Sequence, residues 1–390
     1  MALAARRISP SFVVTLLAGL SFALTGCNGF FVYPGSSSTS STGSGDYAYV
    51  SNSASGSNYI NGYSVAGGSL VATTGSPYSL GFVPSAMVVS IPNTYLYIAS
   101  STTTGSGEIY GYSIGTGGAL TILNSSLGLE AENSSALAVS PDGQWLFSLN
   151  SDGLTMEEYK ISTSTGLLTA EGNYPITASA GGIVTPNAIK VSPSGNYIAC
   201  ALGTAGVDVF SFATSTGVAS SSAAVLPPIS TVNGFYSLAI DSSNNLYLAG
   251  TSGLVVYTVV ANSNGSVTAT LASSSSGYSL GTGNNSITVS KSGSYVFAGS
   301  QNGGTGSTVY AYSIATGGVL TAVSGSPFNA PTDVAALGYD STGDYLLGIG
   351  YSATSGTELY TIGSAGALTS SGSAASGTTL TIPAVLALTH

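Results

Sequence analysis

The stretch Ala136-Leu-Ala-Val-Ser-Pro-Asp-Gly-Gln-Trp-Leu-Phe147 decides the fold, because variants of it return about every 50 residues. It reads as an apolar strand, a tight turn favoured by Pro and Asp-Gly, and a second strand that opens with an aromatic residue. The second strand recurs seven times, beginning at Tyr47, Tyr95, Trp145, Tyr197, Leu246, Tyr295 and Tyr345. Such even spacing along a chain indicates a repeat protein.

Each repeat carries two further strand patterns. Residues 109–114 alternate with period two, residues 115–118 form a Gly-rich turn, and a weaker outer strand follows. Four short antiparallel strands per unit, in seven units, predict an all-β fold, a seven-bladed β-propeller. A single blade cannot bury both of its faces, whereas blades packed in a ring can.

The two ends of the repeat array are complementary. The array starts on a second strand at Tyr47 and stops on an inner strand at 384–388. We therefore expect the C-terminal inner strand to pair with the N-terminal strands in one blade. This pairing closes the ring and removes two exposed sheet edges.

The N-terminus reads as an export signal. Arg6 and Arg7 precede an apolar run at 12–24, so residues 1–26 are expected to be a signal peptide. Leu24-Thr-Gly-Cys27 resembles the lipobox of bacterial lipoproteins, which implies a lipidated Cys27. Residues 27–45 then form a Ser/Gly-rich tether, and residues 46–390 form the propeller.

Lipidation at Cys27 implies that the membrane is a partner. Acyl chains anchor a protein without a transmembrane helix. In lipoproteins that resemble this one, Asn28 in place of Asp favours the outer membrane. We expect an exported, envelope-anchored monomer whose folded part lies in the periplasm or at the cell surface.

Charge and cysteine content exclude several classes of protein. Without Arg6 and Arg7 the chain keeps three Lys and no Arg against 15 acidic residues, which argues against nucleic-acid binding. Cys200 has no partner for an intramolecular disulfide once Cys27 is lipidated, so a buried thiol is expected. The sequence contains no His or Cys cluster for a metal, and no cofactor is expected.

The repeat Ser-Pro-Asp-Gly-x-aromatic-Leu-aromatic resembles the seven-bladed lactonase-like propellers. This group includes 6-phosphogluconolactonase-type and carboxymuconate-cyclase-type enzymes and the related YVTN-repeat proteins. The resemblance covers residues 46–390 and implies lactone chemistry by His, Arg and Glu at one mouth of the channel. Here Arg is missing beyond Arg7, and the only His is His390, which we expect in solvent at the chain end. We therefore assign no catalytic residue.

Polar residues that break the repeat are the candidate ligand-binding residues. Lys190 occupies an inner-strand position where the other copies carry uncharged, mostly small residues, and Asn187, Asn285 and Asp333 precede inner strands. They could line the channel and bind a small polar ligand or an ion. Alternatively, Lys190 extends to solvent and the Asn side chains satisfy turn backbone. Glu157-Glu158 is interpreted as a solvated strand edge.

Two functions follow from these features. The first is a non-catalytic binding or scaffold module at the cell envelope, with a glycan, a small polar ligand or an envelope protein as partner. The alternative is a divergent lactone hydrolase of the 6-phosphogluconolactonase type, with its site at the channel mouth.

Overall fold

The computed structural model describes residues 45–54, 57–102, 106–177, 179, 181–220, 224–227, 232, 234–251, 253–262, 264–272, 277–281, 283, 286–300, 306–330, 334–350, 356–374 and 385–390. All of them lie in one compact unit, 42–390. The signal peptide, Cys27, Asn285 and Asp333 lie outside the described residues, so the expectations for them stay predictions. Within the described part, no helix has the length and apolar character to cross a membrane.

The first four blades follow the order of the repeats. Blade 1 holds β1 (Tyr47–Ala54), β2 (Ser57–Ala66), β3 (Ser69–Ala72), β4 (Tyr78–Leu80) and β33 (Leu386–Leu388). Blade 2 holds β5 (Val83–Val89), β6 (Tyr95–Ser101), β7 (Ser106–Ile114), β8 (Leu120–Ile122) and β9 (Leu129–Glu132). Blade 3 holds β10 (Ser134–Val139), β11 (Trp145–Asn150), β12 (Thr155–Ile161) and β13 (Leu168–Pro175). Blade 4 holds β14 (Val184–Val191), β15 (Tyr197–Gly203), β16 (Val207–Ala213), β17 (Val218–Ala219) and β18 (Ala224–Leu226).

The remaining three blades complete the array. Blade 5 holds β19 (Phe235–Ile240), β20 (Asn245–Gly250), β21 (Gly253–Ala261), β22 (Val267–Leu271) and β23 (Tyr278–Ser279). Blade 6 holds β24 (Ser286–Val289), β25 (Tyr295–Gly299), β26 (Thr308–Ile314), β27 (Leu320–Ala322) and β28 (Phe328–Asn329). Blade 7 holds β29 (Val334–Tyr339), β30 (Tyr345–Gly350), β31 (Thr357–Ile362) and β32 (Leu368–Ala374). Short 3-10 turns, η1 (Thr116–Gly118), η2 (Asn124–Ser126) and η3 (Thr316–Gly318), interrupt blades 2 and 6.

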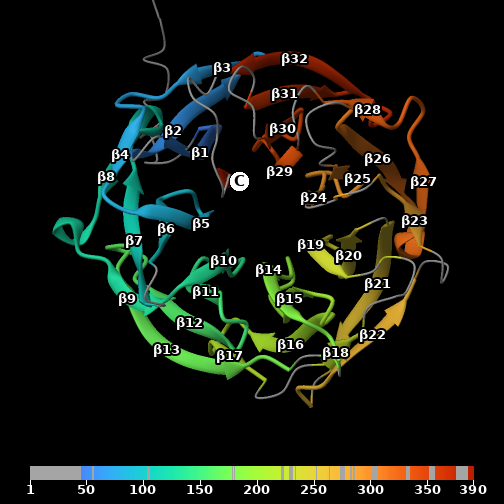
Figure 1. The fold of residues 1–390 in the computed structure, drawn as a ribbon, viewed down its shortest axis with the longest axis horizontal. Coiled ribbons are helices and arrows are strands. Elements are labelled where there is room, and N and C mark those ends of the chain that lie inside the picture. Colours follow the sequence, from blue (N-terminus) through green and yellow to red (C-terminus); the bar gives the residue numbers. More distant parts are fainter. Residues whose placement is uncertain are drawn as a thin grey trace, which may run out of the picture. The chain divides into compact units, whose positions relative to one another are not determined.

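The blades form a ring around a central axis (Figure 1). The innermost strands contact one another in the order β33, β5, β10, β14, β19, β24 and β29, and β29 contacts β33 again. Apolar side chains from facing sheets build seven buried clusters, and each draws on two neighbouring blades. The expectation of an all-β, seven-bladed propeller of antiparallel blades is confirmed.

The ring closes through the C-terminal strand, as the sequence predicts. Strand β33 pairs antiparallel with β1 in the register Ala48↔Leu388, Tyr49↔Ala387 and Val50↔Leu386. The inner strand of blade 1 thus comes from the opposite end of the chain. Thr389 extends the contact, because its hydroxyl donates to the carbonyl of Gly45 at 2.8 Å.

One side-chain hydrogen bond recurs where the inner strand meets the second strand. A Ser, Asp or Thr oxygen accepts from the amide that opens the second strand, which fixes the turn between the two strands. The pairs are Ser90–Tyr95, Ser140–Trp145, Ser192–Tyr197, Asp241–Asn245, Ser290–Tyr295, Asp340–Tyr345 and Thr389–Tyr47, at 2.8 to 3.2 Å. In blade 1 the acceptor, Thr389, comes from the far end of the chain. The hydrogen bond that each other blade makes within one turn here joins the two ends of the chain.

The register of blade 5 corrects one position of the predicted repeat. The sequence pattern places the start of its second strand at Leu246, but β20 starts at Asn245. Asn245 pairs with Thr258, as Tyr197 pairs with Ser211 in blade 4. The reason is a turn shortened by one residue: the Asp241 amide bonds to the carbonyl of Asn245, four residues on, instead of five.

Removal of residues 385–390 is expected to lower the melting temperature by many degrees, because it leaves β1 with an unpaired edge and opens the ring. The substitution Thr389→Val keeps the strand but removes the hydroxyl, and with it the recurrent hydrogen bond and the bond to Gly45. At about 1 kcal/mol for each bond, it should lower the melting temperature by only a few degrees. Thermal unfolding followed by circular dichroism measures both variants. An unchanged melting temperature for the truncated chain would contradict closure by β33.

Candidate functional site at the inner-turn face

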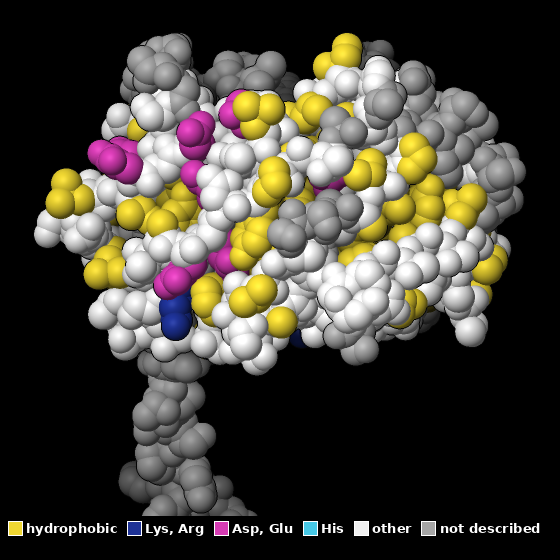
Figure 2. All heavy atoms as spheres, turned by 90° about the horizontal axis from the view of Figure 1, so that it is seen from below, with side chains coloured by type: hydrophobic (Ala, Val, Ile, Leu, Met, Phe, Trp, Pro, Cys, Tyr) yellow, Lys and Arg dark blue, Asp and Glu magenta, His cyan; other side chains and the backbone are white. Residues whose placement is uncertain are grey.

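The turns between inner and second strands lie together on one face of the ring, which we call the inner-turn face. Neighbouring turns contact each other: the Ser194 hydroxyl donates to Asn244 at 2.7 Å, and the Lys291 ammonium group donates to the carbonyl of Ser341. Lys160 is paired with Trp145 beside one of these turns. The Lys side chains of the described residues therefore all lie towards this face. In side view the rim shows acidic groups gathered on one side and Lys near its lower edge (Figure 2).

Lys190 fits its position because its neighbour is small. It lies on β14 and pairs with Ala199 on β15. In the other blades the corresponding inner residue is uncharged, mostly small, and faces a large residue on the second strand: Ala387–Tyr49, Val88–Tyr97, Ala138–Phe147, Ala239–Tyr247, Thr288–Phe297 and Gly338–Leu347. Blade 4 reverses this arrangement, with the large residue, Lys190, on the inner strand and the small one, Ala199, on the second strand. The small Ala199 leaves room for the Lys190 side chain, which is exposed to water on the innermost strand.

His390 lies at the same end of the ring as Lys190, which the sequence did not predict. The Asn93 side chain holds the His390 backbone twice, accepting from its amide at 2.8 Å and donating to its carbonyl at 2.9 Å. The imidazole Nε2 lies 3.4 Å from the carbonyl of Val89. Asn93 can do this because it takes the left-handed conformation at the bend of its turn, with φ of 69°. His390 is exposed to water, as expected, but these hydrogen bonds hold its backbone in place.

The two basic groups influence each other. Both side chains reach water, yet protein atoms surround them on the inside of the ring, and this desolvation lowers the pKa of the Lys190 ammonium group. Desolvation also lowers the pKa of His390, the contact with Val89 opposes that shift, and the charge of Lys190 lowers it further. His390 is therefore a neutral imidazole at pH 7.

Of the other predicted ligand-binding residues, the structure describes Asn187. Asn187 lies three residues before Lys190 on the same extended strand, which separates the two backbones by about 10 Å. Its side-chain amide donates to the carbonyl of Thr185 at 2.6 Å, so it serves the local backbone. Because Asn285 and Asp333 are not described, the predicted site around Asn187 and Lys190 stays a prediction.

The chemistry available at the Lys190–His390 site is that of a cation beside a proton acceptor. Lys190 offers three N–H donors and a positive charge, and a neutral imidazole can accept a proton from water or a hydroxyl group. Within the part of the chain that the structure describes, no group of three or more His, Cys, Asp or Glu side chains could hold a metal ion. The arrangement suits an anion or a polyhydroxylated ligand.

A second set of ionisable groups is buried between blades 3 and 4. Glu158 is 1% exposed and accepts from the Tyr174 hydroxyl at 2.8 Å, so the prediction of a solvated Glu157-Glu158 edge is wrong for Glu158. Asp208 is fully buried and accepts from the Thr177 amide at 2.5 Å. Cys200 is buried across from Asp208, as expected of a structural thiol.

Burial shifts the acidities of this cluster. It raises the pKa of Asp208 to about 6, against the opposing bond from Thr177, and it raises the pKa of Cys200 well above its usual range. The pKa of Glu158 is raised by burial, lowered by the Tyr174 bond, and raised by the charge of Glu171. These carboxyl groups have no route to a ligand at the channel and act on stability.

Comparison with known proteins supports the lactonase-like resemblance. Residues 95–228 match the family described as "Lactonase, 7-bladed beta-propeller". None of the curated proteins matches the chain. The resemblance inferred from the repeats is thus confirmed at the level of the family fold.

Solved structures with the same fold include several bacterial sugar lactonases and candidates for that activity. The periplasmic gluconolactonase of Pseudomonas aeruginosa shares 16% identity at a TM-score of 0.67, over 88% of this chain and 99% of that chain. Candidate 6-phosphogluconolactonases of Bacteroides uniformis ATCC 8492 (TM-score 0.66, 88% and 99% covered) and Bacteroides fragilis NCTC 9343 (0.63, 90% and 99%) also share 16% identity. At this identity the likeness shows the fold alone.

The buried carboxyl groups predict an unusual pH dependence of stability. Because the folded-state pKa of Asp208 lies above its unfolded value near 4, the contribution of Asp208 to the free energy of unfolding should be greatest below pH 4. It should fall by about 2–3 kcal/mol as the pH rises to about 6 and then level off. Urea unfolding at a series of pH values measures this slope.

The variant Asp208→Asn should flatten that slope, because an amide does not ionise. Asp344→Asn, at an exposed turn position, is the matched control and should keep the slope of the parent. The same slope between pH 4 and 6 in Asp208→Asn as in the parent would contradict the assignment.

Proposed function

We propose that this protein is an exported binding module whose lactonase-like propeller holds a small anionic or polyhydroxylated ligand at the Lys190–His390 site. The observation that carries the proposal is that Lys190 and His390 both lie on the inside of the ring, near enough for the Lys190 charge to act on the imidazole. The chain has only three Lys and one His beyond its first 26 residues, and two of these four residues influence each other here. In a chain with so few basic groups, this pairing favours a role in binding.

The surroundings of the site favour a ligand with negative charge. Desolvation is the main cause of the lowered pKa of His390, and the positive charge of Lys190 adds to it by disfavouring the protonated imidazole. A carboxylate or phosphate placed between them would relieve that repulsion and receive charge-assisted hydrogen bonds. Such a ligand would supply a negative charge beside the Lys190 ammonium group.

A second function, hydrolysis of a lactone, is favoured by the state of His390. A neutral imidazole in contact with water can act as a general base, and the charge of Lys190 could stabilise the oxyanion that forms when water adds to the carbonyl. The solved structures that share the fold include a periplasmic gluconolactonase. The residues differ from the pattern of His, Arg and Glu implied by the family, so binding without turnover remains our first proposal.

Titration with gluconate and 6-phosphogluconate tests the site. The variant Lys190→Met should weaken binding about 10- to 100-fold, because it removes a charge-assisted contact worth about 1.5–3 kcal/mol. Affinity in the parent should increase as the pH falls from about 7 towards 5, since an anion favours protonated His390, and His390→Gln should abolish this pH dependence. Isothermal titration calorimetry measures both effects.

The variant Lys291→Met is the matched control, because it removes a Lys from the same face at an exposed turn position. Equal losses for Lys190→Met and Lys291→Met would contradict a specific site. The same samples mixed with glucono-δ-lactone separate the two functions. Turnover that disappears in His390→Gln supports hydrolysis, and binding without turnover supports the module.

The anchor proposal is tested at Cys27. Metabolic labelling with a palmitate analogue should label the parent expressed in a Gram-negative host, and Cys27→Ala should abolish the label and release the protein from the membrane fraction. Cys200→Ala is the control, because Cys200 is buried and should not affect labelling. Label that persists in Cys27→Ala would contradict lipidation at this residue.

A further inference from the structure

The rim of the ring has an open groove between blades 4 and 5. Its walls come from β16 and β17 on one side and from the β21–β22 hairpin on the other, and its volume is about 1150 Å³. None of its lining residues belongs to an inner strand, so the groove is separate from the Lys190–His390 site.

The groove exists because an inter-blade contact is changed at this junction. At four other junctions, an aromatic side chain of one blade donates a hydrogen bond to the outer hairpin of the next: Tyr49 to Gly118, Tyr97 to Gly166, Trp145 to Thr214 and Tyr295 to Ser364, at 2.8 to 2.9 Å. The rings fill the space under the hairpin so closely that a Cβ on Gly217 would lie 2.2 Å from Trp145.

Blade 4 makes neither contact: Ala199 stands at the position of Tyr49 and Tyr97, and Tyr197 stands at the position of Trp145 and Tyr295. Tyr197 is fully buried, and its hydroxyl donates to the carbonyl of Asn244 at 3.4 Å instead of reaching the hairpin. The nearest atom to a Cβ built on Gly265 is the Ser211 hydroxyl, at 3.8 Å. A single hydrogen bond, from Ser211 to the carbonyl of Gly265 at 2.7 Å, replaces the aromatic contact, and the space beside it stays open.

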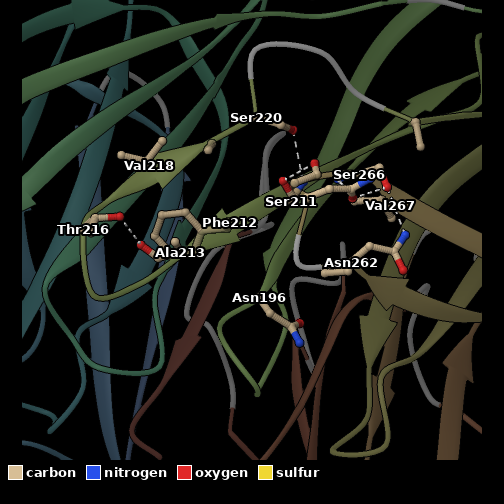
Figure 3. A pocket seen from close by; sticks show the side chains of 15 residues that line it. Asn196, Ser211, Phe212, Ala213, Thr216, Val218, Ser220, Asn262, Ser266 and Val267 are labelled. Carbon is tan, nitrogen blue, oxygen red and sulfur yellow. Dashed lines mark hydrogen bonds between the residues drawn. The ribbon is translucent and has the colours of Figure 1, made fainter.

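The lining is polar but carries no ionisable group. Figure 3 shows Thr216, Val218 and Phe212 on the blade 4 side, and Asn262, Ser266 and Val267 on the blade 5 side. Hydroxyl and amide groups alternate with aliphatic surface, of which Val218 is 59% exposed. An uncharged lining of this kind gives no preference for an ionic ligand.

Three Asn side chains line the groove, and each leaves one of its two polar atoms for a ligand. Asn262 donates its Nδ2 to Ser266 at 3.0 Å, and Asn264 accepts from the Ser266 amide at 3.0 Å. Asn196 accepts from the Ser194 hydroxyl at 2.6 Å. Among the described residues no protein partner meets the Asn262 Oδ1, the Asn264 Nδ2 or the Asn196 Nδ2. The groove thus offers one acceptor and two donor groups to a ligand. Local hydrogen bonds within each turn or hairpin hold these side chains in place.

We propose that this groove binds a neutral carbohydrate chain. Sugar hydroxyls both donate and accept, which matches the available amide ends, and the C–H faces of a pyranose can pack on Val218 and Val267. The site is independent of the proposed ligand at Lys190, and either can fail without the other.

Binding is tested with the full folded chain on neutral hexasaccharides, namely cello-, xylo-, manno- and malto-hexaose, by isothermal titration calorimetry. The parent should bind at least one of them with millimolar affinity or better. Ala213→Trp should reduce that affinity at least tenfold, because Ala213 is an exposed lining residue and an indole there fills the groove. Val218→Trp blocks the same space from a second position and should act alike.

Ala315→Trp is the matched control. Ala315 is exposed at the equivalent position of blade 6, two residues after Ser313, as Ala213 follows Ser211. It should keep the affinity of the parent. The proposal is overturned if the parent binds none of the four sugars at 10 mM, if both groove variants bind as the parent does, or if Ala315→Trp loses as much affinity as they do.

Discussion

The hydrogen bond from a Ser, Asp or Thr side chain to the first amide of the second strand is the contact on which the propeller depends. It is made in all seven blades and fixes where each inner strand ends and each second strand begins. Each bond contributes only about 1 kcal/mol, but it aligns two strands whose register sets every side chain of the blade. Because Thr389 supplies the acceptor in blade 1, the closing joint satisfies the same requirement without a continuous chain.

The inter-blade contacts depend on that register. The residue whose amide is held by the turn is usually aromatic, and in blades 3 and 6 this residue, Trp145 or Tyr295, donates to the outer hairpin of the next blade. In blades 1 and 2 the donor is Tyr49 or Tyr97, two residues further along the same strand. A Gly in the left-handed conformation then lets the hairpin approach the ring, as Gly166 (φ 71°) and Gly217 (φ 68°) do. Where Tyr197 turns inward, the blades stay joined by Ser211 but separate at the rim. The groove is thus a local departure from a contact that four other junctions use for packing.

The sequence predicts the architecture well because the pattern repeats seven times. It fails where a single residue depends on distant parts of the chain. The sequence pattern predicts that the second strand of blade 5 starts at Leu246. The turn after Asp241 is one residue shorter than in the other blades, so the strand starts at Asn245. Glu158 alternates like a surface residue, but Tyr174 and blade 4 cover it. His390 could have been placed from closure alone, since pairing Ala387 with Tyr49 puts it three residues on at the inner-turn face. Its contact with Asn93 required the structure.

The two candidate sites arise from the same physical cause. In a ring of similar blades, each pair of neighbours buries the same kind of apolar cluster. We therefore look for a binding surface where one blade differs from the others. Blade 4 departs twice: it places Lys190 against Ala199 on its inner strands, and it withdraws Tyr197 from the rim. Tyr197 and Ala199 are two residues apart on β15 and lie in the same buried cluster, so a change in packing at one affects the other. The inner charge and the outer groove are therefore linked through a single strand, which makes β15 the element that distinguishes this propeller from a purely structural ring.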